Sequence, residues 1–247
     1  MKKIIGVVSG KGGVGKTTFT VNTGLALKEM GNEVVLVDAD MATSNLGLHL
    51  GFFQFPVGLQ DALRGHIELE NTIYTHPSGL KVIPSSISMA YIRTSPSPYR
   101  MKNLLSELDG FVMIDSPPGL GKEAFMVLKS CDEVLVVTNP ELPAVTDAMK
   151  IIQVARELRR DVRGIVVNRV KGRHELRTEE IEEMCDARVI GKIPEERRIK
   201  KSLFDKTPIV QMSPHCPASV AFRKIAAGLA GMNYQPPRML MLRRIFG

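Results

Sequence analysis

The sequence predicts an α/β fold, in which a mostly parallel, twisted sheet carries helices on both faces. Short, unbroken apolar runs recur along the 247 residues, as expected for strands that are buried on both faces. Helix-length segments separate several of these runs, and strands that alternate with helices form parallel sheets. Ligands of such sheets bind at the carboxyl ends of the strands, so the residues that follow the apolar runs are the candidate site.

In chain order, the first strand is expected at residues 4–8, and the first helix at residues 18–30. Further apolar runs predict strands at residues 34–37, 80–83, 111–114, 134–137, 165–167 and 189–190. Residues 85–99 contain Pro and Ser and predict a surface excursion, which is followed by a helix near residues 102–108. The last helix of the core is expected near residues 218–230.

Composition favours one domain, because 247 residues with 44% hydrophobic side chains suffice for one core and are few for two. We expect this domain at residues 1–230, a Pro-containing linker at 231–238 and a separate tail at 239–247. The three cysteines lie far apart, which predicts reduced thiols and no metal cluster. With no room for a signal peptide before the first strand and no apolar run of about 18 residues, a cytoplasmic protein is expected. Its net charge of +7 favours an acidic partner such as nucleotide, nucleic acid or lipid.

The loop after the first strand carries a phosphate-binding pattern. Gly10, Gly15, Lys16 and Thr17 complete it, and a helix follows. Backbone N–H groups of such a loop surround phosphates, the lysine reaches the outer ones, and the hydroxyl holds Mg²⁺. The residues expected to bind nucleotide here are Gly10, Lys11, Gly12, Gly13, Val14, Gly15, Lys16, Thr17 and Thr18. We call residues 10–18 the phosphate loop.

Lys11 is one lysine more than phosphate binding needs. It lies near the start of the loop, where its side chain is expected to point away from its own nucleotide and to reach phosphates held by another subunit. Hydrolysis would then depend on dimerisation. The simpler alternative is a solvated lysine.

Three carboxylates follow two of the predicted strands. Asp38 and Asp40 end one strand, and Asp115 ends another, so all three are delivered to the edge where phosphates would lie. We expect Thr17, Asp38 and Asp115 to serve Mg²⁺ directly or through water. Phosphoryl transfer to water needs positioning and charge neutralisation, so Lys11, Lys16 and Asp40 are the predicted catalytic residues, with Asp40 orienting the attacking water. Helix capping is the alternative role for each Asp.

On these residues the chain resembles the MinD/ParA family of dimerising ATPases, and most closely its MinD branch. The lysine pair in residues 11–18 matches the family's deviant Walker A signature, and residues 37–40 and 115–119 resemble its two switch segments. Residues 138–141 are similar to a Thr-x-Pro-Glu segment of the MinD branch. The resemblance implies a P-loop NTPase fold and hydrolysis of ATP with Mg²⁺. It also implies that Asn168 hydrogen-bonds the adenine and that Pro194 and Glu195 line its pocket.

The tail carries an amphipathic pattern. On a helical wheel its apolar residues share about one half, except Leu240, which lies between the two arginines on the other half. The residues expected to contact an anionic membrane are Met239, Leu242, Arg243, Arg244, Ile245 and Phe246. The pattern is similar to the membrane-targeting sequence that ends MinD. A terminal helix docked on its own domain is the alternative.

Together these features predict a MinD-like ATPase that dimerises on ATP, binds the inner face of the cell membrane reversibly and regulates division-site placement. A ParA-type ATPase that binds DNA nonspecifically through its basic helices is the main alternative. An FlhG-type flagellar-placement ATPase would share both the loop and the tail, and a nucleotide-gated scaffold with negligible turnover also stays open. An iron-sulfur carrier is disfavoured, because paired cysteines are absent. The sequence identifies no protein activator or effector.

Overall fold

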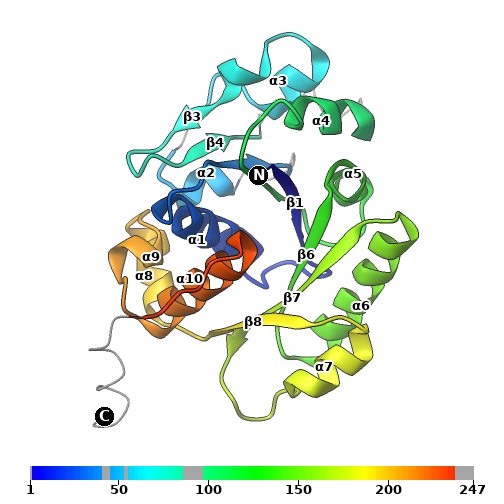
Figure 1. Cartoon of the computed structure of the whole chain (residues 1–247), viewed down its shortest axis with the longest axis vertical. Helices are drawn as coiled ribbons and strands as arrows, with labels where there is room; N and C mark the ends of the chain where they lie inside the picture. Colours follow the sequence, from blue (N-terminus) through cyan, green and yellow to red (C-terminus); the bar gives the residue numbers. More distant parts are fainter. Residues whose placement is uncertain (1, 41–44, 53–54, 86–96, 237–247) are drawn as a thin grey trace.

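The computed structural model describes residues 2–40, 45–52, 55–85 and 97–236. Within these ranges, strands form one eight-stranded sheet in the order β3-β4-β2-β5-β1-β6-β7-β8 (Figure 1). The bounds are β1 Lys3–Val8, β2 Val34–Asp38, β3 Tyr74–Thr75, β4 Lys81–Ile83, β5 Phe111–Asp115, β6 Glu133–Thr138, β7 Asp161–Val170 and β8 Val189–Pro194. All neighbouring strands pair in parallel except β3, which runs antiparallel to β4 at one edge.

Helices cover both faces of this sheet (Figure 1). The described helices are α1 Lys16–Glu29, α2 Leu46–His49, α3 Leu59–Arg64, α4 Pro98–Leu105, α5 Lys122–Ser130, α6 Leu142–Glu157, α7 Thr178–Cys185, α8 Arg198–Phe204, α9 Ile209–Met212 and α10 Pro217–Ala230, with a 3-10 turn at Leu69–Thr72. Helices α1 and α10 pack on one face, and α4, α5, α6 and α7 on the other. This arrangement confirms the predicted fold class.

The strands alternate between two separate cores, because successive side chains of a strand point to opposite faces. Ile5 and Val7 of β1 join Phe19 and Phe222 of α1 and α10 in one core. Ile4 and Val8 join the core beneath α5 and α6. Burial on both faces explains why apolar runs, rather than alternating patterns, predicted these strands.

Several element boundaries differ from the predictions; β8, for example, continues to Pro194 rather than ending at residue 190. Helix α1 begins at Lys16 rather than at residue 18, and α4 runs over Pro98–Leu105 rather than 102–108. Proline fits the first turn of α4, since the N–H it lacks would have no partner there. Strand β7 extends over Asp161–Val170, well beyond the apolar residues 165–167.

The described chain ends six residues after helix α10, within the predicted linker. Helix α10 stops at Ala230, where Gly231 takes a left-handed conformation, and residues 232–236 form neither helix nor strand. Residue 237 onward, including the predicted membrane tail, lies outside the described residues, as do residues 86–96 of the predicted excursion. Among the helices that are described, none combines the length and apolarity needed to cross a membrane.

Candidate functional site

The phosphate loop leaves β1, the strand that lies between β5 and β6 in the sheet, and leads into the N-terminus of α1. Gly13 and Gly15 have φ values of 78° and 93°, in the left-handed region that glycine adopts without strain. The loop therefore turns sharply enough to direct the first N–H groups of a 14-residue helix toward a bound anion.

Gly10 is required for packing against α6. A Cβ at this position would lie 2.6 and 2.7 Å from the main-chain carbon and oxygen of Asp147. Because real Cβ atoms do not approach backbone so closely, only glycine allows α6 to lie against the start of the loop.

Lys16, Thr17 and Asp115 meet in a buried cluster, as the sequence predicted. The Lys16 Nζ lies 3.1 Å from Asp115 Oδ1, and the Thr17 hydroxyl donates to Asp115 Oδ2 at 2.6 Å. Thr20, one turn after Lys16 on α1, adds a hydroxyl 3.4 Å from Oδ1. A hydroxyl beside a carboxylate at the base of a phosphate loop is the donor set that Mg²⁺ takes with a nucleoside triphosphate. The residues therefore fit the predicted metal.

Lys11 differs from Lys16 in its surroundings. Its side chain is exposed, and among the described residues it makes no hydrogen bond or ion pair. Its backbone carbonyl accepts a hydrogen bond from the Ser9 hydroxyl at 3.1 Å, which fixes the main chain at this point. Lys16 is thus buried and paired with Asp115, whereas Lys11 is exposed.

Asp38 and Asp40 lie at the same edge as Asp115, and Asp38 is the direct neighbour of Asp115 in the β2–β5 register. The two oxygens of Asp38 accept N–H bonds from Asp40 at 3.1 Å and Leu46 at 3.2 Å. Its carboxylate therefore joins the end of the first switch segment to the first residue of α2. The roles of Asp38 at the metal and of Asp40 toward water stay predictions.

The second switch segment is attached to the phosphate loop. The Ser116 N–H donates to Val7 O at 3.1 Å, and the Gly119 N–H donates to Ser9 O at 2.8 Å. These bonds place residues 115–119, which lead into α5, against the strand and loop that would hold the phosphates.

Asn168, Pro194 and Glu195 are brought together by neighbouring strands. Val170 pairs with Pro194 in register, and the Glu195 N–H donates to Val170 O at 3.0 Å. The Asn168 amide donates to Val14 O at 2.7 Å and occupies the space next to Gly15. Asn168 therefore supports the phosphate loop, and its predicted contact with adenine stays a prediction.

His49 of α2 is a site residue that the sequence analysis missed. Its Nε2 lies 3.4 Å from the Thr18 hydroxyl, and its Nδ1 lies 2.8 Å from Asn45 O. Burial lowers the pKa of His49, so its ring is neutral and Nδ1 carries the proton it donates. A lone histidine carries little signal in a sequence, whereas Thr20 was detectable from its four-residue spacing to Lys16.

The sequence of this chain matches a known protein family over most of its length. Residues 1–230 match the ParA family model, described as NUBPL iron-transfer P-loop NTPase. The three cysteines, Cys131, Cys185 and Cys216, are separate buried thiols, and no cluster of potential metal ligands occurs in the part of the chain that is described.

Individual relatives agree with the family match. An uncharacterized ATP-binding protein of Methanocaldococcus jannaschii is 39% identical over 235 residues, which cover 94% of this chain and 89% of that protein. The septum site-determining protein MinD of Thermotoga maritima is 33% identical over 211 residues, with 81% and 78% covered. The antiactivator FleN of Pseudomonas aeruginosa is 28% identical over 239 residues, with 91% and 85% covered.

Solved structures show the same similarity. MinD of Pyrococcus horikoshii, complexed with Mg-ADP, superposes with a TM-score of 0.86 at 32% identity and covers 93% of this chain and 96% of its own. MinD in the MinC:MinD complex of Aquifex aeolicus gives 0.85 at 29% identity, with 96% and 98% covered.

Proposed function

This chain belongs to the ParA family of P-loop NTPases, and on that premise we propose that it is a MinD-like ATPase that hydrolyses ATP to ADP and phosphate. In this proposal ATP drives dimerisation and attachment to the inner face of the cell membrane, and hydrolysis reverses both. The protein would then act as a spatial regulator of division-site placement from the cytoplasm.

The observation that supports the proposal best is the contrast between Lys11 and Lys16. Lys16 is buried beside Asp115 and belongs to its own site. Lys11 is exposed at the mouth of the same loop. An exposed cation there is available to phosphates bound by a second copy of the chain, and such a contact exists only when nucleotide is present.

The remaining site residues have defined tasks in this mechanism. Backbone N–H groups of the phosphate loop and Lys16 hold the phosphates, and Thr17 with Asp115 would hold Mg²⁺, which neutralises phosphate charge when bound. Asp40 orients water toward the outer phosphate, and Lys11 of the second copy stabilises the charge that develops there. In this proposal the second switch segment changes position when that phosphate is lost, because the Gly119 N–H is bonded to Ser9 O at the start of the loop.

Membrane attachment is assigned to residues 239–247. One short amphipathic segment with two arginines anchors weakly, because each basic residue near an anionic surface contributes on the order of 1 kcal/mol. Two tails in one dimer gain roughly 10² to 10⁴ in avidity without any new contact. The oligomeric state then controls how long the protein stays on the membrane.

Light scattering tests the nucleotide-dependent dimer. The Asp40→Ala variant, saturated with ATP, is expected to be dimeric, whereas Asp40→Ala/Lys11→Ala is expected to be monomeric but still to bind ATP. The Lys16→Ala variant is the matched control, since it is expected to lose nucleotide binding itself. A monomeric Asp40→Ala variant in saturating ATP would refute the proposal.

Vesicle sedimentation tests the membrane step. Binding to anionic vesicles is expected with ATP and not with ADP, and a chain truncated after Tyr234 is expected not to bind in either nucleotide. Equal sedimentation in all conditions would refute the proposal that ATP controls membrane binding.

A flagellar-placement ATPase of the FlhG type is a second candidate, because it would share the loop and the tail; the antiactivator FleN, at 28% identity, shows that the relatives of this chain include proteins other than MinD. Deletion of the gene in its host separates the two, through misplaced septa or through altered flagella. A ParA-type role in DNA segregation would instead give ATP-dependent, salt-sensitive DNA retention that survives truncation after Tyr234.

A further inference from the structure

A basic and apolar surface lies at the corner of the molecule where the described chain ends. Its apolar members are large and exposed: Phe204 is 84% exposed, Met232 50% and Leu203 38%. Its basic members are the exposed side chains of Arg197, Lys200 and Lys201. We call these six residues the α8 corner. The phosphate loop and its carboxylates do not include any of them.

Helix α8 has one side that packs against the core and another that is exposed to solvent. Ser202 is buried and Ile199 packs against the core beneath α1 and α10. Phe204 lies four residues after Lys200 and three after Lys201, a spacing that puts the three exposed residues at neighbouring positions on one face of the helix. The Phe204 ring is therefore presented to solvent beside two basic residues.

The lysines are free to meet an external charge. Neither Lys200 nor Lys201 pairs with a carboxylate anywhere in the described ranges, whereas Arg198 is already paired with Glu196 at 3.0 Å. Each exposed ammonium thus keeps its full charge toward solvent.

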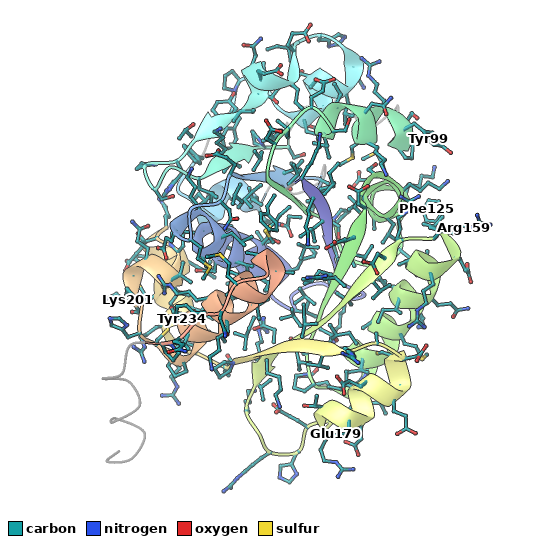
Figure 2. The ribbon with its side chains drawn as sticks, in the orientation of Figure 1. Tyr99, Phe125, Arg159, Glu179, Lys201 and Tyr234 are labelled. Carbon is teal, nitrogen blue, oxygen red and sulfur yellow. The ribbon has the colours of Figure 1, made fainter. Side chains whose placement is uncertain are left out.

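The corner lies beside the end of the described chain. Helix α9 packs against both α8 and α10, and Figure 1 shows the three helices together on the side where the described chain ends. Lys201 and Tyr234 are labelled at this same corner in Figure 2. Met239, the first predicted tail residue, is three residues beyond Pro236, a span of at most roughly 10 Å. A tail that lies in a membrane surface therefore keeps Pro236 within about one Debye length of that surface.

We propose that the α8 corner is a second lipid-contacting surface, which binds an anionic bilayer together with the C-terminal tail. This inference rests on the proposed membrane attachment. Lys200 and Lys201 bind the lipid phosphates, and the Phe204 ring enters the interfacial region of the bilayer, where aromatic side chains are favoured. A nucleic-acid backbone would satisfy the lysines as well, but it offers no comparable apolar region to a ring that is 84% exposed. The corner would fix the orientation of each subunit on the membrane by adding a second point of contact to the tail.

A single-tryptophan probe tests this directly, because the natural chain contains no Trp. The Phe204→Trp variant of the full chain is mixed with Mg-ATP and vesicles of phosphatidylglycerol and phosphatidylethanolamine. Its emission is expected to shift to shorter wavelength and to be quenched by brominated lipids. The control is Tyr99→Trp, which places the probe on α4, 79% exposed and far from the corner in Figure 2; its emission is expected to stay unchanged.

Charge removal provides a second, independent readout. The Lys200→Gln/Lys201→Gln variant is expected to bind the same vesicles roughly 25-fold more weakly, at about fivefold per lysine. The matched control Arg159→Gln/Arg188→Gln removes the same charge from exposed sites elsewhere and is expected to change binding less than twofold. Thermal unfolding of each variant checks that the fold is intact.

The outcomes separate this inference from the function on which it rests. If the full chain sediments with vesicles and truncation after Tyr234 abolishes this, but the Phe204→Trp probe is silent, the tail anchors alone and the α8 corner is not a lipid surface. If no chain binds vesicles, both proposals are wrong. If the lysine variant loses DNA retention while its vesicle binding is unchanged, the corner is a nucleic-acid surface and the lipid inference is wrong.

Discussion

Replacing Asp115 by Asn tests whether the buried Lys16–Asp115 pair organises the site before nucleotide arrives. The substitution keeps the size of the side chain and removes its charge, while Lys16 keeps an ammonium that is only 9% exposed. We expect Asp115→Asn to lower the free energy of unfolding by about 3 kcal/mol in the absence of nucleotide, the lower end of what is found when one partner of a buried pair is removed.

The magnitude follows from the geometry. At 3.1 Å and an effective dielectric constant of about 20, the attraction between the two charges is about 5 kcal/mol before desolvation is subtracted. Asparagine still offers an oxygen to Lys16, which recovers part of the loss. For the coupling between the two side chains, after desolvation, we expect about 2 kcal/mol.

A double-mutant cycle in urea measures this coupling. The variants are Asp115→Asn, Lys16→Met and their combination, each without nucleotide. The control is the pair Lys102–Asp132, whose atoms are closer, at 2.8 Å, but whose side chains are 37% and 47% exposed. Because water screens that pair, its cycle is expected to give less than about 1 kcal/mol. Additivity within about 0.5 kcal/mol at Lys16 and Asp115, or a larger coupling in the control, would refute the reasoning.

Three further predictions concern single residues. Gly10→Ala is expected to lower the free energy of unfolding by about 2–3 kcal/mol, because the backbone of Asp147 fills the space that a Cβ would need. The control, Gly13→Ala, meets no neighbouring atom and is expected to cost only the backbone strain of a positive φ, about 1–2 kcal/mol. The opposite order in urea denaturation would contradict this reasoning. Burial raises the pKa of Cys131 from 9.0 to about 11, so the folded state keeps a proton that the unfolded state loses. Stability is therefore expected to fall by up to about 2.7 kcal/mol as pH rises from 9 to 11, and the fall should be smaller in Cys131→Ala; equal slopes would exclude this cause. Asn168→Ala leaves a carbonyl of the phosphate loop without its 2.7 Å partner, so a loss of about 1–2 kcal/mol and weaker ADP binding by calorimetry are expected; unchanged values in both would contradict the supporting role.

The sequence predicted the central sheet well and located the phosphate loop between the first strand and the first helix, because both depend on local patterns. A strand buried on both faces must be apolar throughout, and a loop that wraps phosphates must place glycines and a lysine at fixed spacing. Lys16, Thr17 and Asp115 were found for this reason, although they come from segments about a hundred residues apart.

Other features depend on contacts that no local pattern reveals. Strand β3 has two residues, and the hydroxyl of Tyr74 in it donates to Val57 O in a preceding loop. The bond between Asn168 and Val14 joins residues 154 positions apart. His49 enters the site only because α2 packs beside α1. Each of these is fixed by tertiary packing, so the sequence alone had no means to place it.

The two hydrogen bonds of Asp38 have a consequence for how such chains change length. The carboxylate of Asp38 accepts one hydrogen bond from the N–H of Asp40 and one from the N–H of Leu46, eight positions after Asp38. These two bonds set the distance between the end of β2 and the start of α2. We expect that adding or deleting a residue between Asp40 and Leu46 would disturb one of these two bonds, and the buried group that lost it would need another partner. Relatives that keep an aspartate here are therefore expected to keep the spacing to the following helix, and to accommodate insertions elsewhere.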